Sequence, residues 1–154
     1  MSTKVLSAPI DQLAPIITEL IESGRDVTIT VTGNSMRPLW YHKKNNVTLA
    51  ACDPTQLKKG DVPFYCRTDG RYVLHRIIRV NEDTFDLVGD GQYNVEYGLE
   101  KFRVIAVAKA FTKGGRAYTM KNIVYRLYSC VWIWLLPVRK YLFAIYSKLK
   151  RVFR

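Results

Sequence analysis

The chain has 154 residues, of which 48% are hydrophobic and 24% charged, and this composition is that of one globular domain and not of a disordered segment. Its formal net charge of +11 is unevenly placed. Residues 1–100 carry 11 basic and 13 acidic side chains, whereas residues 101–154 carry 13 basic side chains and no acidic one. The C-terminal part is therefore expected to meet an anionic partner, such as a lipid surface or a nucleic acid.

The N-terminal part predicts one helix followed by short strands. Apolar residues from Leu13 to Ile21 recur at three- and four-residue spacing, which predicts an amphipathic helix over 9–23. Valine and isoleucine then alternate with threonine over 26–32, the pattern of a half-buried strand, until a Gly-Asn pair interrupts it. Turn signals separate further predicted strands at 46–51, 61–67, 72–80, 84–88 and 102–112.

This succession of short strands predicts the fold class. Strands and turn residues at such close spacing are typical of a bent β-sandwich or a small barrel. We therefore expect a mainly β protein with an N-terminal helix and a C-terminal helical tail. The β-domain with its leading helix is predicted to occupy residues 1–118, and the tail residues 119–154.

The predicted tail is both apolar and basic. A strongly apolar helix is expected over 123–138, interrupted by Pro137, and a second apolar-basic helix over 141–153. The longest stretch without a charge, 127–138, has 12 residues, whereas a membrane-spanning helix needs about 20. The pattern favours a bent helical pair lying on an anionic membrane surface, at the cytoplasmic face. The alternative is a helix docked on the protein's own β-domain.

Cysteine and histidine are sparse. Cys52, Cys66 and Cys130 form no Cys-x-x-Cys pair, and the first residues lack the basic and apolar runs of a secretory signal peptide. We therefore expect free thiols in a reducing compartment. His42 and His75 lie in no cluster with metal-ligand spacing, so neither a metal nor another cofactor is predicted.

Four short strings follow one another in a distinctive order. They are Thr-Gly-Asn-Ser-Met-Arg-Pro-Leu at 32–39, Leu-Lys-Lys-Gly-Asp-Val at 57–62, Tyr-Val-Leu-His-Arg-Ile-Ile at 72–78 and Val-Gly-Asp-Gly at 88–91. This order resembles the superfamily of type I signal peptidases and LexA-like serine peptidases, in the branch that uses histidine. The similarity runs from about residue 31 to residue 108, and it implies the signal peptidase fold and a serine endopeptidase activity.

The resemblance also implies roles for individual residues. A serine hydroxyl becomes a good nucleophile when a base takes its proton, and histidine suits that task near neutral pH. The resemblance makes Ser35 the nucleophile and His75 the base. It further implies that Asp90 orients the imidazole. Asp61 matches the other Gly-Asp position and is interpreted as a structural turn residue.

The same resemblance implies where the substrate binds. Gly33 and Asn34 precede the serine, and glycine allows a substrate backbone to come close. Met36 is implied to shape the pocket beside the cleft. The backbone N–H of Ser35 is the implied oxyanion donor, and a second donor stays unassigned because Gly33 stands where many bacterial members carry a serine. The implied substrate is a peptide or protein precursor, cut at or near a membrane.

Two other functions remain open. A catalytically inactive peptidase-like protein could act as a binding module for membrane or nucleic acid, and the tryptophan-rich tail favours lipid over nucleic acid. A self-cleaving regulator, like the SOS-response repressors, is less favoured because only about 25 residues precede the first predicted strand, too few for a helix-turn-helix unit.

Overall fold

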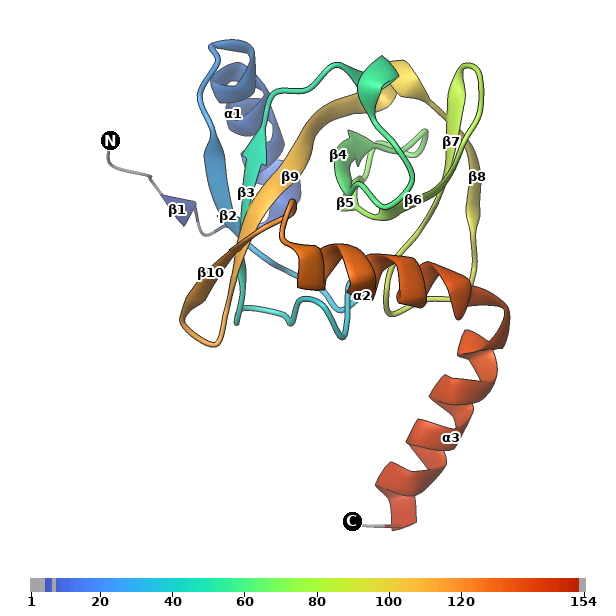
Figure 1. The fold of residues 1–154 in the computed structure, drawn as a ribbon. Helices are drawn as coiled ribbons and strands as arrows, with labels where there is room; N and C mark the ends of the chain where they lie inside the picture. The colour runs from blue at the N-terminus through green and yellow to red at the C-terminus, as the bar shows by residue number, and fades with distance from the viewer. Residues whose placement is uncertain (1–4, 7, 153–154) are drawn as a thin grey trace.

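The structure, a computed structural model, describes residues 5–6 and 8–152. It is mixed α/β, with 33% of the residues in helices and 31% in strands. An N-terminal helix precedes two antiparallel sheets, one of them curled into a half-barrel, and two helices follow (Figure 1). The expected mainly β class is therefore corrected to mixed α/β, because the leading helix and the tail helices together hold as much of the chain as the strands do.

The larger sheet has seven strands. Its order is β1 (Val5–Leu6), β2 (Val27–Thr30), β3 (Asn46–Ala50), β9 (Val104–Lys113), β4 (Pro63–Cys66) and β5 (Tyr72–Leu74), and β10 (Arg116–Thr119) also pairs with β9. All pairs are antiparallel except β1 with β2. The long strand β9 shifts register against both β3 and β4, and such bulges bend a sheet. The curl seen around β4 and β5 in Figure 1 follows from these irregularities.

The smaller sheet has the order β6 (Arg76–Val80), β7 (Thr84–Val88) and β8 (Glu96–Glu100). The sequence predicts one strand over 72–80, but the structure divides it at His75. The chain before this residue pairs within the larger sheet and the chain after it within the smaller one. His75 therefore lies at the corner between the two sheets, where it is buried.

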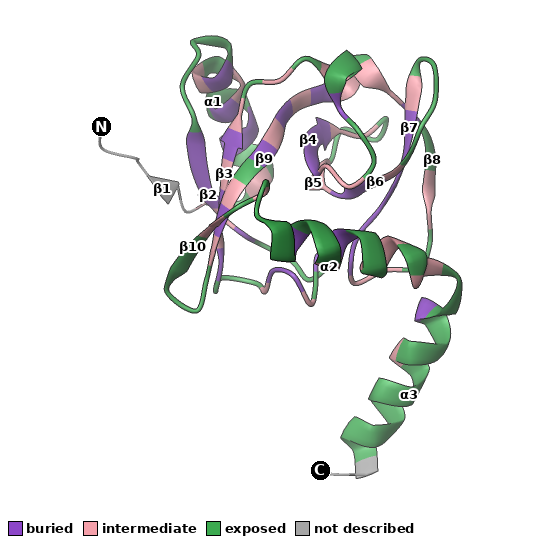
Figure 2. Ribbon diagram, viewed as in Figure 1, coloured by how far each residue is buried: buried purple, intermediate pink, exposed green. Residues whose placement is uncertain are grey.

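Helix α1 (Ile10–Glu22) covers the curled sheet and confirms the predicted leading helix. Its apolar stripe, which includes Leu13, Ile17 and Ile21, joins the main core beside Trp40 and Phe64. Full burial of such a side chain stabilises the fold by roughly 1.5–3 kcal/mol. A second, smaller core lies between the sheets, and Figure 2 shows the buried segments concentrated on the inner faces.

The C-terminal part forms two helices with different surroundings. Asn122 caps α2 (Ile123–Trp134), whose Tyr125 and Ser129 are buried against the body. A turn over η3 (Leu136–Val138) leads to α3 (Arg139–Val152), which projects away from the body (Figure 1). The remaining short helical turns are η1 (Pro54–Gln56) and η2 (Lys101–Arg103). Helix α2 is therefore docked on the protein's own β-domain, the alternative to a membrane-bound helical pair. Helix α3 is exposed along most of its length.

Across the described residues, none of the helices has both the length and the apolar character needed to cross a bilayer.

Candidate active site

His75 is fixed by a buried tyrosine and a carboxylate. Its Nδ1 atom lies 3.3 Å from Tyr65 Oη and 3.6 Å from Glu96 Oε2. Tyr65 comes from β4, where it pairs with Val73 of β5, and Glu96 begins β8. Three strands from two sheets therefore meet at the imidazole, and this explains why the corner position buries it.

The hydrogen bonds around Tyr65 fix which ring nitrogen carries the proton. Burial, with a smaller effect of Glu96, raises the pKa of Tyr65 far above its usual range, so the phenol keeps its proton. That proton is donated to Glu96 Oε2 at 3.0 Å. The phenol oxygen is then an acceptor for an N–H on His75 Nδ1. In the neutral imidazole this arrangement leaves Nε2 unprotonated, as a general base requires.

Glu96 remains ionised because a guanidinium holds it. Arg67 donates from Nε and Nη2 to the carboxylate at 2.8–3.1 Å. Burial raises the pKa of Glu96, but its interactions with the nearby His75, Arg67 and Tyr65 outweigh it and bring the pKa to about 2. A permanent negative charge therefore lies behind the imidazole and stabilises the cation that forms when His75 accepts a proton.

Ser35 lies in the turn that follows β2, close to the other side of the His75 ring. Gly33 has a φ of +87°, which favours glycine and turns the chain. The Ser35 carbonyl accepts a 2.7 Å hydrogen bond from the Gly91 N–H. A Cβ atom on Gly89 would collide with this carbonyl and would lie 3.2 Å from His75 Nε2. The serine turn and Nε2 are therefore separated only by a residue without a side chain.

The two proposed catalytic side chains are neighbours without direct contact. Within the described residues, no hydrogen bond joins Ser35 Oγ to His75. Ser35 faces a groove formed with β5, whereas His75 lines a second hollow on the other side of the Gly89–Gly91 turn. The structure thus places the Ser35 turn and the His75 ring on either side of Gly89, with the two side chains lining different hollows.

The groove beside Ser35 is lined mainly by apolar residues. Besides Ser35 it is lined by Ile10, Ile29, Thr30, Val31, Thr32, Gly33, Met36, Trp40, Phe64, Tyr72, Val73 and Leu74. Two of the predicted substrate residues, Gly33 and Met36, belong to this lining, and Asn34 is exposed at its end. Strand β5 is the last strand of its sheet, and its three residues line the groove. An extended peptide can pair with an edge strand.

Asp90 does not contact His75, contrary to the role that the resemblance implies. Its carboxylate accepts two hydrogen bonds from Arg76, at 2.7 and 2.8 Å, and one from Tyr128 at 2.8 Å. Arg76 and Asp90 are both fully buried. Asp90 therefore joins the strands to α2, and Glu96 occupies the position of the acid behind the histidine. Asp61 accepts from the Lys58 N–H, in agreement with the predicted turn role.

Comparisons with family models, curated proteins and solved structures find no match for this chain. Among the described residues, no group of three histidine, cysteine or acidic side chains could hold a metal ion.

Proposed function

We propose that the protein is a serine endopeptidase of the signal peptidase type, with Ser35 as nucleophile and His75 as general base. The observation that carries this proposal is the position of His75 Nε2 beside the Ser35 turn, since a Cβ atom on Gly89 would lie 3.2 Å from Nε2 and would collide with the Ser35 carbonyl. The Tyr65, Glu96 and Arg67 chain behind the ring supports it, because a base needs a fixed tautomer and a stabilised cation.

The reaction follows from these positions. Ser35 Oγ forms a bond to the peptide carbonyl carbon while its proton moves to His75 Nε2, and the charged carbonyl oxygen accepts from the Ser35 N–H. No hydrogen bond within the described chain uses that N–H. The C–N bond then breaks, and the leaving amine takes the proton from Nε2. A water molecule, deprotonated by the same nitrogen, hydrolyses the acyl-serine and restores both residues.

The substrate is a peptide in an extended conformation. The acyl side would add a strand along β5, with apolar side chains in the groove that includes Met36. The leaving side would enter the hollow lined by His75, Arg67, Arg71 and Glu96, which is polar and charged. The site therefore favours apolar residues before the cut and polar residues after it.

Cleavage of a mixed peptide library, followed by mass spectrometry, tests the activity. The native chain should produce a defined set of cuts that disappears in Ser35→Ala and in His75→Ala. Ser147→Ala is the matched serine control, because its hydroxyl is exposed on α3 and bonds only the Ala144 carbonyl. Cuts that persist in Ser35→Ala would refute the proposal.

An inactive binding module is the second candidate, favoured by the absence of a Ser35–His75 hydrogen bond in the described residues. It predicts that the folded native chain cuts none of the library peptides. It also predicts that peptides bind with the same affinity to the native chain and to Ser35→Ala, measured by fluorescence anisotropy.

Gly89 gives a further prediction, since it separates the two catalytic residues. Gly89→Ala places a methyl group against the Ser35 carbonyl and close to His75 Nε2, so the serine turn must move. We expect kcat/KM to fall at least tenfold and the fold to lose about 1–3 kcal/mol, typical of overpacking. Peptide cleavage and urea unfolding measure both effects.

The control for this variant is Gly114→Ala in the β9–β10 hairpin. A Cβ there meets open space but must adopt a positive φ, so the change strains the backbone far from the site. It should cost about 1 kcal/mol of stability and leave cleavage unchanged. Equal kinetic effects of the two substitutions would contradict the position assigned to Gly89.

A further inference from the structure

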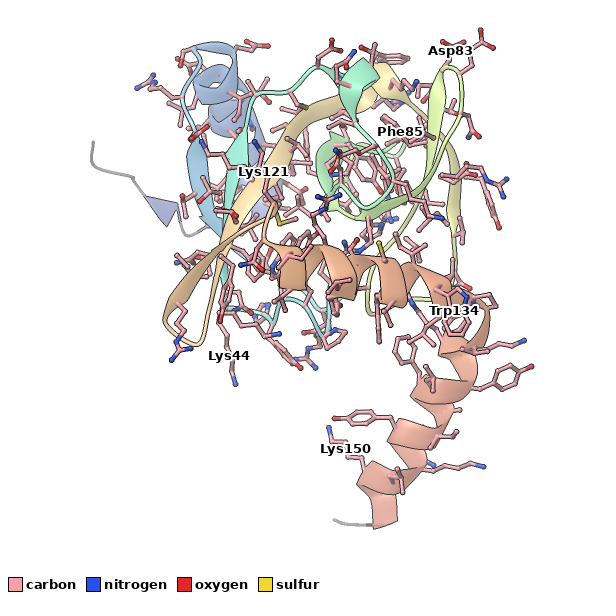
Figure 3. The ribbon with its side chains drawn as sticks, in the orientation of Figure 1. Lys44, Asp83, Phe85, Lys121, Trp134 and Lys150 are labelled. Atoms are coloured by element: carbon pink, nitrogen blue, oxygen red, sulfur yellow. The ribbon has the colours of Figure 1, made fainter. Side chains whose placement is uncertain are left out.

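We propose that α3 is a docking surface for an anionic lipid bilayer and that it attaches the protein to the membrane without α2. The proposal concerns the outer helix only, and it does not depend on the peptidase activity. Figure 3 shows α3 standing clear of the body, with Lys150 pointing outward from its last turns.

One face of α3 is apolar and largely exposed to solvent. Tyr141, Ile145 and Leu149 recur every four residues. Leu142 and Tyr146, also four residues apart, lie next to them on the same side of the helix. Each of these side chains is between 39% and 67% exposed. A set of large apolar residues with this exposure marks an interaction surface.

The rest of the helix carries uncompensated positive charge. Lys140, Lys148, Lys150 and Arg151 are exposed, and the sequence contains no acidic residue after Glu100. Among the described residues, no salt bridge involves any of these four cations. An apolar face between basic side chains is the pattern of helices that lie in the interface of an anionic bilayer.

The same charges decide between the occupants of this surface. A second copy of α3 would bring two sets of cations together without a single carboxylate to pair with them. A nucleic acid would neutralise the cations but leave the tyrosines, leucines and isoleucine in water. Of these three occupants only an anionic bilayer satisfies both, because headgroups pair with the cations while the apolar side chains enter the acyl boundary.

The start of α3 is fixed to the body beside the candidate active site. Arg139 is fully buried and donates to the carbonyls of Gly89, Gln92 and Trp132 at 2.7–3.2 Å. Gly89 also separates the Ser35 turn from His75. A bilayer bound to α3 would therefore hold the site at a set position near the lipid surface, where a membrane-bound peptide could reach it.

Vesicle sedimentation with the full chain tests the proposal. The protein should bind vesicles of phosphatidylcholine with 30 mol% phosphatidylglycerol and should bind pure phosphatidylcholine at least tenfold more weakly. Lys148→Gln with Lys150→Gln removes two cations and should weaken binding roughly 30-fold, about fivefold for each charge. Ile145→Glu with Leu149→Glu should abolish binding. Lys43→Gln with Lys44→Gln, an equal loss of charge in an exposed loop of the body, should leave it unchanged.

Each contrary result has a definite meaning. Equal binding to both vesicles, or equal weakening by the α3 and loop pairs, would overturn the assignment. Binding to duplex DNA without vesicle binding would assign the surface to nucleic acid, and a dimer in sedimentation velocity without vesicle binding would assign it to a second copy. Unchanged thermal unfolding of the variants would show that they fold. Ser35→Ala should bind vesicles like the native chain, so failure here is separate from failure of the peptidase proposal.

Discussion

Asp90→Ala is expected to lower the free energy of unfolding by about 3–5 kcal/mol, because it leaves the Arg76 cation buried without its counter-ion. Arg76 is 0% exposed, and besides Asp90 its guanidinium contacts the Tyr125 and Ser129 hydroxyls and the Gly60 carbonyl. These neutral partners accept hydrogen bonds but do not neutralise the charge. A loss of this size is a large part of the 5–15 kcal/mol that stabilises a typical domain.

Urea unfolding of matched variants measures the effect. Asp69→Ala removes a carboxylate that contacts Arg71 at 2.7 Å on the exposed surface, and it should lower the free energy of unfolding far less, because water screens this pair. The double change Arg76→Met with Asp90→Leu should be more stable than Asp90→Ala, because no unpaired charge remains. Equal losses in Asp69→Ala and Asp90→Ala would contradict this account. If Asp90→Ala does not fold, the milder Asp90→Asn gives the same comparison.

This buried pair also shows that composition alone does not reveal which tail residues pack against the body. The sequence shows a helix rich in tryptophan, tyrosine and leucine, and such a helix suggests lipid. In the structure, Tyr125, Tyr128 and Ser129 of α2 face the body, where they bond Arg76 and Asp90. The partners of those hydroxyls lie 38 to 53 residues away, and no local pattern reveals them.

Helices and strands whose apolar residues recur at a regular spacing could be predicted from the sequence, and those without such a spacing could not. The helix over 9–23 and the strand over 26–32 each show one regular apolar pattern, and the structure confirms both within two residues. Strand β8 was missed because Gly98, at a φ of +70°, breaks its alternation and Tyr97 points into solvent. Strand β10 follows a hairpin and buries none of its residues, so it carries no apolar signal.

The same limits apply to the candidate site. Ser35 and His75 are each marked by a local string, and the structure places them on either side of Gly89. The acid behind the histidine could not be found, because Glu96 lies at the start of the missed strand. The alternation of a strand also does not show that the chain passes from one sheet to the other at His75. Because of this change of sheet, Arg76 bonds Asp90 while His75 contacts Tyr65.

Glu96→Gln is expected to lower kcat/KM for peptide cleavage by about 10²-fold, the lower end of what a general base contributes. The neutral amide keeps the shape of the side chain but cannot stabilise the imidazolium that forms as Ser35 attacks. The loss should appear mainly in kcat, because Glu96 acts on the reaction through Tyr65 and His75.

Glu100→Gln on the same strand is the matched control. Glu100 pairs with Arg103 at the surface, and its loss should leave kcat unchanged. Glu96→Asp keeps the negative charge and should recover part of the lost kcat. Equal kcat values for Glu96→Asp and Glu96→Gln would mean that the charge plays no part, and this outcome would remove Glu96 from the catalytic arrangement.

Acid unfolding gives an independent measure of the same charge. The pKa of Glu96 is about 2 in the folded protein and near 4.5 in an unfolded chain, so its ionised form stabilises the fold above pH 4.5. This stability is lost as the pH falls from 4.5 towards 2. Urea unfolding at pH 5.5, 4 and 3 should therefore show a steeper decline in the native chain than in Glu96→Gln. If the free energy of unfolding fell equally in both proteins, the pair with Arg67 would not keep the Glu96 carboxylate ionised. The mechanism would then have no fixed negative charge behind His75.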